Sequence, residues 1–482
     1  TETGGADVTG YILYRNDGSA DGAVSIEVYG AGAASDATTT TSDLSFEVTG
    51  LSGGVEYQFE VAARSSAGLG DRSEVVGVST SSAVAAAPVA THQTASSITL
   101  GWSAPTVGTG AAATGYQVYL VTGTVEQPVY TVVYDGADST ATSVELSSLD
   151  SGSMYTYVLS SLSDAGESDK SVAMSASTAP GVATGLSSTL QTTSSISLAW
   201  TAPTIPSGEA VTGYKVYARS AAVAVGASAR IGDGTDGVVL DSLIYDGRGD
   251  VTTATDPSTE LNDLEGGSLY TYLVGVLSEA GESDRSASLD VSTAAPAPTA
   301  LTSVSQTTTG MELSWTAPEV SSGEAVTGYK VYRDDGAGGV LDVVAYDSRE
   351  NSGDFVSTSC SVSGLTGGLT YRYQVSALSL AGESDRSAEM TSPTAPFQVS
   401  GVASTAQTTG SITLSWSAPS ASDGSNAASG YMVYHNDGVG GSEMSTVGYD
   451  GSSSASTSGT ISGLVGGRGY SFVVSALNRG GE

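Results

Sequence analysis

The chain has 482 residues, of which 51 are acidic and 16 are basic, and its formal net charge is −35. This charge repels nucleic-acid backbones and anionic membrane surfaces, and the sequence has no run of about 18 apolar residues that could span a bilayer. One cysteine and two histidines exclude an intrachain disulfide framework and leave little material for histidine catalysis. We therefore expect no nucleic-acid partner, no membrane insertion, no catalytic centre and no tightly bound cofactor.

The four tryptophans share one motif, in which Trp is followed by Ser or Thr, then Ala and Pro. Ahead of them, apolar and small polar residues alternate, as in Ile98-Thr-Leu100-Gly-Trp102. A period of two is typical of a half-buried strand with the Trp facing inward. The Pro cannot donate to a strand ladder, so the strand ends there. The expected core tryptophans are Trp102, Trp200, Trp315 and Trp416.

Two further elements recur five times. About ten residues after the Pro comes Gly-Tyr-x-Val/Leu-Tyr, which predicts a second strand. Later comes Leu-x-x-Gly-x-x-Tyr, here called the corner, whose Tyr opens another alternating strand that runs into a Gly-containing turn. The corner tyrosines are Tyr57, Tyr155, Tyr270, Tyr371 and Tyr470.

These repeats resemble fibronectin type III modules. The resemblance implies an all-β fold of tandem immunoglobulin-like β-sandwiches with seven strands in two sheets. It also implies that each corner Tyr hydrogen-bonds to nearby backbone. Short Ala-Pro linkers act as semi-rigid spacers, so we expect the sandwiches to form an extended rod. For function the resemblance says little, because this fold hosts many roles.

The repeats divide the chain into five modules, numbered in chain order. The first lacks the counterparts of the first two strands and its Trp, the third carries an insertion at about 220–243, and the fifth lacks the last strand. We expect either a longer repeating protein or neighbouring copies to supply these strands. The expected boundaries are 1–82, 83–180, 181–294, 295–395 and 396–482.

Two segments of the third module are candidate binding sites. Arg248-Gly249-Asp250 is a tripeptide recognised by integrin-type receptors in some fibronectin modules, and the alternative is a plain acidic turn. Asp233, Asp236 and Asp241 could offer oxygen ligands to weakly bound Ca²⁺, and the alternative is a solvated insertion loop.

Hydroxyl clusters recur in the turn between the first two strands of four modules, here called the threonine turn. The sequence has no Asn-x-Ser/Thr sequon, so O-linked sugars are the glycans to consider. The alternative is that Ser and Thr simply suit turns. The candidate O-glycosylation residues are Thr94, Ser96, Ser97, Thr192, Thr193, Ser194, Ser195, Thr307, Thr308, Thr309, Thr408, Thr409 and Ser411.

The favoured function is a non-enzymatic structural protein, extracellular or on the cell surface, that forms a filament or stalk. Its partners would be neighbouring copies of itself, with a cell-surface receptor or glycan as a further possibility. One alternative is an adhesion protein that uses the Arg248-Gly249-Asp250 turn. Another is the spacer region of a larger secreted polysaccharide-degrading enzyme.

Overall fold

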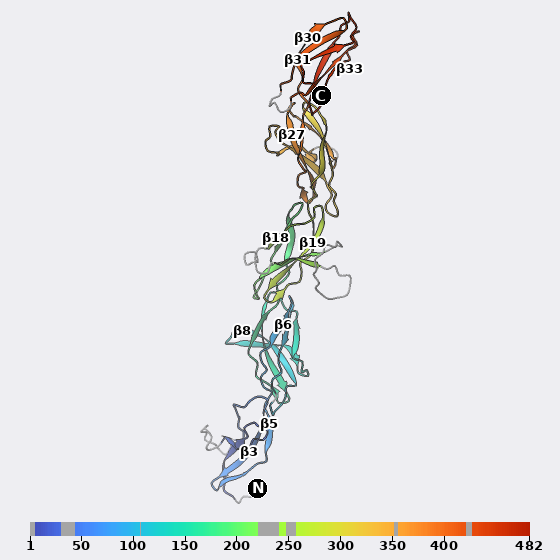
Figure 1. Cartoon of the computed structure of the whole chain (residues 1–482). Coiled ribbons are helices and arrows are strands. Elements are labelled where there is room, and N and C mark those ends of the chain that lie inside the picture. Colours follow the sequence, from blue (N-terminus) through green and yellow to red (C-terminus); the bar gives the residue numbers. More distant parts are fainter. Residues whose placement is uncertain are drawn as a thin grey trace.

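A computed structural model describes residues 5–29, 44–106, 108–219, 241–246, 257–350, 355–420 and 427–482. The modules follow one another end to end as an extended rod with the two termini at or near its opposite ends (Figure 1). Among the described residues, the only helix is the 3-10 turn η1 (Ser348–Glu350), and no helix is long and apolar enough to cross a membrane. The prediction of a tandem all-β array is confirmed.

The second module shows the complete pattern of two antiparallel sheets. One sheet has the order β10-β7-β6 and the other the order β12-β11-β8-β9, with β13 also paired to β11. The last strand of the sandwich is thus split into β12 and β13, which both pair with β11. The strands are β6 (Val89–Gln93), β7 (Ser97–Gly101), β8 (Gly115–Gly123), β9 (Pro128–Gly136), β10 (Ser143–Ser147), β11 (Met154–Ser163), β12 (Gly166–Glu167) and β13 (Met174–Ser177).

The third and fourth modules repeat this topology. The third has β14 (Thr184–Gln191), β15 (Ile196–Thr201), β16 (Gly213–Arg219), β17 (Asp241–Asp246), β18 (Ser258–Leu261), β19 (Leu269–Ser278), β20 (Gly281–Glu282) and β21 (Leu289–Ser292). The fourth has β22 (Thr299–Gln306), β23 (Gly310–Thr316), β24 (Gly328–Arg333), β25 (Val343–Asp347), β26 (Ser359–Ser363), β27 (Thr370–Ser379), β28 (Gly382–Glu383) and β29 (Met390–Pro393).

The two terminal modules have fewer strands among their described residues. In the first, β1 to β5 form one sheet, and in the fifth, β33-β32-β35 faces β30-β31-β34. The first has β1 (Val8–Arg15), β2 (Ile26–Tyr29), β3 (Glu56–Ser65), β4 (Gly68–Arg72) and β5 (Val76–Ser79). The fifth has β30 (Ser400–Gln407), β31 (Ser411–Ser417), β32 (Gly430–His435), β33 (Thr446–Gly451), β34 (Ser458–Ser462) and β35 (Phe472–Leu477).

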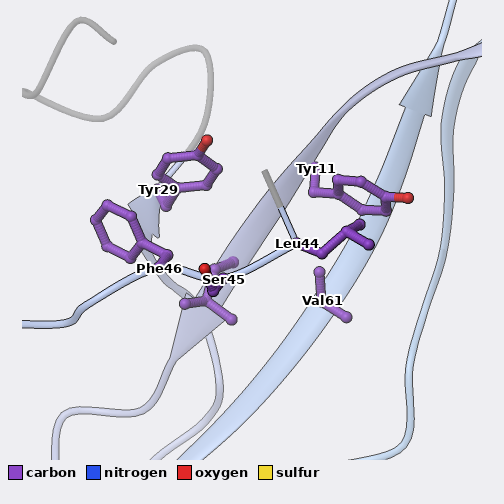
Figure 2. Close-up of a pocket in the computed structure, with 7 residues that line it drawn as sticks. Tyr11, Tyr29, Leu44, Ser45, Phe46 and Val61 are labelled. Carbon is purple, nitrogen blue, oxygen red and sulfur yellow. The ribbon is translucent and has the colours of Figure 1, made fainter. Parts of the chain in front are cut away.

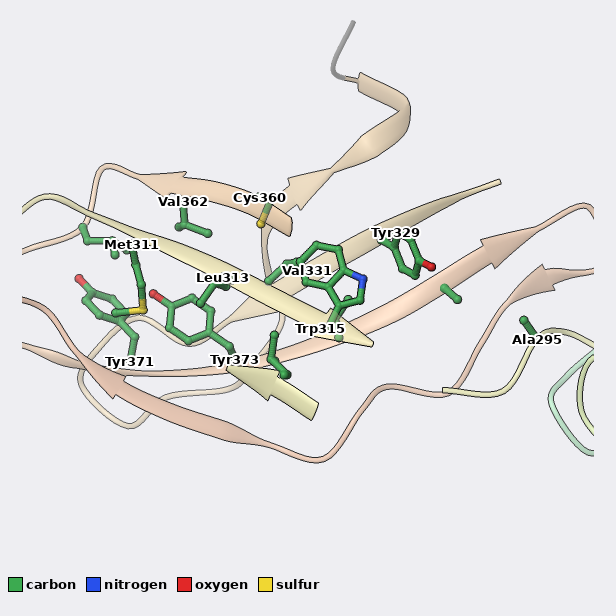
Figure 3. Packing of buried hydrophobic residues seen from close by; sticks show 14 residues of the cluster. Ala295, Met311, Leu313, Trp315, Tyr329, Val331, Cys360, Val362, Tyr371 and Tyr373 are labelled. Carbon is green, nitrogen blue, oxygen red and sulfur yellow. The ribbon is translucent and has the colours of Figure 1, made fainter. Parts of the chain in front are cut away.

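Each complete core lies between the two sheets, as Figure 3 shows for the fourth module. Trp315 from β23 meets Tyr329 from β24 with ring centroids 5.2 Å apart in an edge-on arrangement. The pair joins the two sheets, because its rings come from opposite layers. Equivalent pairs join Trp102 to Tyr116, Trp200 to Tyr214 and Trp416 to Tyr431, and all four indoles are only 5–9% exposed.

The corner tyrosines lie at the edge of the cores. Tyr57 and Tyr371 are buried, whereas Tyr155, Tyr270 and Tyr470 are half-buried. In the three complete modules the fully buried ring is two residues further on, at Tyr157, Tyr272 and Tyr373. Because residues two apart in a strand share a face, both rings point toward the core, and the corner Tyr covers its open end.

Candidate functional site

The recurring specialised structure in this chain is the joint between successive modules. It begins at the corner, where the Tyr hydroxyl accepts a hydrogen bond from the backbone N–H five residues earlier. This bond is present in all five modules, at 2.8–3.0 Å. The corner glycines, such as Gly152 and Gly267, have φ near +65°, a conformation that favours glycine. Each corner is therefore a fixed turn.

A threonine in each linker fastens the linker to the corner behind it. Thr178 donates through Oγ1 to the carbonyl of Asp150 at 2.7 Å, and Thr293 donates in the same way to Glu265 at 2.7 Å. The next linker residue is tied to the threonine turn: the N–H of Ala179 donates to the carbonyl of Thr94 at 2.9 Å. The linker thus leaves the module in a set direction, as expected of a stiff spacer.

The next module docks onto this corner through the loop between its second and third strands, here called the docking loop. In the third module, Gly208 N–H donates to the Gly152 carbonyl at 2.8 Å, and Ser207 Oγ accepts from Met154 N–H at 3.0 Å. The following joint has the same two bonds. There Gly323 donates to Gly267 at 2.9 Å, and Ser322 accepts from Leu269 at 3.1 Å.

The first joint has the same design with different side chains. Gly110 N–H donates to the Gly54 carbonyl at 3.0 Å, and Thr109 Oγ1 accepts from the N–H of Glu56 at 3.1 Å. In the last joint the docking loop includes residues outside the described ranges. There Asn478 Nδ2 donates to the Thr394 carbonyl at 3.0 Å. Three joints therefore share one backbone geometry.

The docking loops at the first three joints need glycine, because the two backbones approach closely there. A Cβ placed on Gly208 or Gly323 would lie 2.6 Å from the carbonyl carbon of the corner glycine that it contacts. Real Cβ atoms essentially never come that close, and a backbone atom cannot move aside as a flexible side chain can. The sequence analysis did not single out these residues. The repeated run Ser-Gly-Glu-Ala-Val-Thr-Gly-Tyr, at Ser207 and again at Ser322, was the signal that could have found them.

A second contact connects successive modules. In it, the Ala-Gly-Glu turn of one module lies against the threonine turn of the module before. The N–H of Asp385 donates to Thr193 Oγ1 of the third module at 3.1 Å. Between the second and third modules, a hollow of about 340 Å³ includes Gln93, Met174, Glu209 and Glu279 in its lining. With two separate contacts, the joint between the third and fourth modules resists bending in more than one direction.

A tyrosine covered by a cation recurs on the outer face of the larger sheet. Lys170 lies 4.1 Å from the ring centroid of Tyr119, and Arg386 lies 3.7 Å from that of Tyr332. The Tyr119 hydroxyl donates to Glu167 at 2.5 Å. Partial burial, then the bond to Glu167, raise the pKa of Tyr119 to about 12. These rings are 7% exposed, so they offer no open aromatic platform.

The glutamate that accepts the hydrogen bond of the cation-covered tyrosine stays ionised at neutral pH, as Glu383 beside Tyr332 shows. Partial burial works to raise the pKa of Glu383, but hydrogen bonds from Ser376 and Tyr332 and the nearby Lys330 ammonium outweigh it and lower that pKa. General acid catalysis at neutral pH needs the opposite shift. In the part of the chain that the structure describes, no group of three or more His, Cys, Asp or Glu residues could hold a metal ion. Burial raises the pKa of the Cys360 thiol to about 12.

Most of the predicted binding residues of the third module lie outside the described residues. These are Arg248, Gly249 and Asp250 of the tripeptide, and Asp233 and Asp236 of the calcium hypothesis. Asp241 begins strand β17, which pairs with β16. These hypotheses stay predictions.

Some hydroxyl groups of the threonine turns are buried and hydrogen-bonded within the turn. Two of the predicted glycosylation sites, Ser97 and Ser195, are therefore corrected. Ser97 and Ser195 are buried, because Ser97 is the first residue of a core strand and Ser195 directly precedes one. Each hydroxyl also pairs with the turn threonine, Thr94 or Thr192, at 2.9 Å. These two hydroxyls are therefore not accessible for a sugar. The half-buried candidates are Thr94, Thr192, Thr193, Thr308 and Ser411, and the exposed ones are Ser96, Ser194, Thr307, Thr309, Thr408 and Thr409. Their modification stays a prediction.

The first module has an open apolar hollow of about 410 Å³ on the core side of its sheet (Figure 2). Tyr11 and Leu13 of β1 line it, and Tyr29 meets Phe46 with ring centroids 4.3 Å apart. In the complete modules the residue equivalent to Tyr11 packs against a tryptophan of the smaller sheet. The hollow is thus the part of a sandwich core that the smaller sheet covers elsewhere in the chain.

Comparison with known proteins agrees with this architecture. Residues 83–177, 179–292, 296–393 and 395–482 each match the family described as Fibronectin type III domain. The chain belongs to this family.

Parts of two bacterial proteins resemble this chain. Exoglucanase B of Cellulomonas fimi is 29% identical over 327 residues, which is 63% of this chain and 25% of that protein. Chitinase A1 of Niallia circulans is 39% identical over 141 residues, which is 26% of this chain and 18% of that protein. This chain therefore spans about a quarter or less of these relatives. The crystal structure of chicken CNTN1 FN1-FN3 domains covers 65% of this chain and 98% of its own at 13% identity, with a TM-score of 0.27.

Proposed function

We propose that this fibronectin type III array is the spacer region of a secreted protein that degrades a polysaccharide. The observation that carries the proposal is the repeated joint, in which Gly110, Gly208 and Gly323 dock in the same way on the module before. Such joints favour a stiff rod that holds its two ends apart, whereas a flexible tether needs no such contacts.

The similar proteins support the substrate class. Their names, exoglucanase and chitinase, describe enzymes that act on a glucan and on chitin. A location outside the cell fits this role. We therefore place the spacer ahead of the filament or adhesive functions that the sequence suggested. In this proposal the array neither binds the polysaccharide nor turns it over, since the recurring outer tyrosines are covered by cations.

A spacer affects how fast the catalytic domain that it carries degrades an insoluble substrate. This rate is what the test measures. The 482-residue array would be placed between a glucanase catalytic domain and a cellulose-binding domain, and compared with a Gly/Ser linker of equal contour length. We expect equal rates on a soluble substrate. On insoluble cellulose the rates should differ by about twofold or more, because the linker sets the effective concentration of the catalytic domain at the surface.

Matched variants sharpen this experiment. The Gly208→Ala and Gly323→Ala double variant should shift the insoluble rate toward that of the Gly/Ser linker, whereas Gly469→Ala, with no atom within 4 Å of the added methyl, should leave it unchanged. Equal rates for all linkers on insoluble cellulose would overturn the spacer proposal. So would pelleting of the isolated array with cellulose or chitin, since the array would then be a binding region.

A further inference from the structure

The linker between the first and second modules passes directly from bonds with one module to bonds with the next. Thr80 donates through Oγ1 to the Ser52 carbonyl at 2.8 Å, and the Ser81 carbonyl accepts from the corner N–H of Gly54 at 2.6 Å. Both bonds hold the linker to the first module. The next residue, Ser82, bonds to the second module. The way in which Ser82 is held therefore affects the angle between the two modules.

Two serines of β11 hold Ser82 and the residue after it. Ser82 donates through Oγ to Ser161 Oγ at 2.6 Å, and Ser161 Oγ donates to the Ala83 carbonyl at 2.8 Å. Ser163 Oγ accepts from the N–H of Ser82 at 3.2 Å. Ser82 is 3% exposed and Ser161 is fully buried. A buried hydroxyl must find its hydrogen-bond partner inside the protein, and for Ser82 that partner is Ser161.

The other three joints have apolar residues at the same two positions. One position lies two residues after the linker threonine, and the other lies six residues after the corner Tyr of the following module. The two residues are here called the linker pair. The pairs are Ser82 with Ser161, Pro180 with Val276, Ala295 with Ala377, and Pro396 with Ala476. All eight residues are buried. Each joint therefore has either two hydroxyls or two apolar side chains, and none has one of each.

Mixing the two kinds of pair would break hydrogen bonds at a buried place. Valine in place of Ser161 would leave the Ser82 hydroxyl without its partner, and an unpaired buried hydroxyl is costly. Proline in place of Ser82 has no N–H, so it would lose the bond to Ser163 as well. Ser161 would still have Ser168 Oγ at 3.1 Å, so the loss on its side is smaller.

We propose that the linker pair matches each linker to the module that follows it and thereby fixes the angle of that joint. The linker that contains Ser82 fits a module with serine at the position of Ser161, and the other linkers fit modules with valine or alanine there. The docking loop cannot supply this distinction, because three joints share its backbone geometry. Ser82 and Ser161 are therefore positioning residues that are specific to the first joint.

A double-mutant cycle in the full chain tests this matching. Spin labels on cysteines that replace the exposed residues Asp71 and Ser143 report the distance between the first two modules, and buried Cys360 stays unlabelled. We expect one narrow distance peak in the parent chain. Ser161→Val should lower the ratio of molecules inside this peak to those outside it about tenfold, because it leaves a buried hydroxyl unpaired. In the Ser82→Pro background the same substitution should change that ratio by less than about threefold.

The second joint allows the reverse cycle, which starts from an apolar pair. Its labels replace the exposed residues Ser143 and Thr189. Val276→Ser should lower the ratio about tenfold, because the new hydroxyl faces proline. Adding Pro180→Ser should bring the ratio back to within about threefold of the parent.

Two controls separate the angle of the joint from the fold of the module. Ser147→Val changes an exposed serine of the second module and should leave the distances unchanged. Amide hydrogen exchange in β7 and β8 should be the same in the parent and in Ser161→Val; if it is not, the cycle at the second joint decides alone. Equal effects of Ser161→Val beside serine and beside proline, or no recovery at the second joint, would overturn the proposal. Neither result bears on the spacer function, which the assay on insoluble cellulose tests separately.

Discussion

The substitution Gly323→Ala, which adds one methyl group, should undock the fourth module from the third. In Gly323→Ala the new Cβ would lie 2.6 Å from the Gly267 carbonyl carbon and 2.9 Å from the Ser268 nitrogen. These are backbone atoms, so the docking loop must withdraw. It then loses the bond from Gly323 to Gly267 and the bond from Leu269 to Ser322.

The expected loss of docking free energy follows from these two bonds. Each contributes about 1 kcal/mol net, so docking weakens by about 2 kcal/mol. Since 1.4 kcal/mol is a factor of ten, the ratio of docked to undocked molecules falls about thirtyfold. The change lies in a loop that contacts the neighbouring module, so we expect the fourth module to keep its fold and its melting temperature.

Distances between spin labels on the two modules measure the effect. The exposed residues Thr189 and Ser305, replaced by cysteine, carry the labels, and buried Cys360 stays unlabelled. We expect a narrow distance distribution in the parent chain, a broad one in Gly323→Ala, and no change in the control Gly469→Ala. If the distribution in Gly323→Ala is as narrow as in the parent and centred at the same distance, the docking loop does not set the joint and our reasoning fails.

Three further predictions concern the modules themselves. Tyr371→Phe removes the acceptor of the Thr366 N–H and should destabilise the fourth module by about 1 to 2 kcal/mol in urea unfolding. The Cys360 thiol should resist iodoacetamide at pH 8 and react only on unfolding, which mass spectrometry detects. The folded pKa of Tyr119 is about 12, above an unfolded value of about 10, so its contribution to stability is complete below pH 10 and is lost as the pH rises toward 12. The melting temperature of the second module should fall across this window, and Tyr119→Phe should reduce the fall.

The sequence was sufficient to predict the sandwich because one period-two pattern recurs with its large residues in fixed places. Trp102 and its three counterparts mark the inward face of a strand, and the structure buries all four. The corner bond was also expected, because the resemblance to fibronectin type III modules implies it. Both features depend on residues close together in the chain, which a repeat makes visible.

The joints were not predicted, because they depend on contacts between residues more than 50 positions apart. Ser207 and Gly208 look like ordinary loop residues, and only the position of Gly152 in the previous module gives them a role. The accessibility of the threonine turns was misjudged in part for a different reason. Ser97 and Ser195 read as turn residues, but each is the first residue of, or lies next to, a core strand and is covered by the sandwich.

The shared geometry of the joints has a consequence for how such a chain can lengthen. At the three joints that share this geometry, the corner of one module contacts the docking loop of the next, so a module inserted by duplication brings both halves of a joint with it. The distance between the two ends of the array then grows by one module length with each insertion, and no docking surface has to change. Because these joints share one geometry, each added joint of this kind also turns the far end by the same angle about the rod. The number of repeats therefore sets the direction in which the two ends face as well as the distance between them.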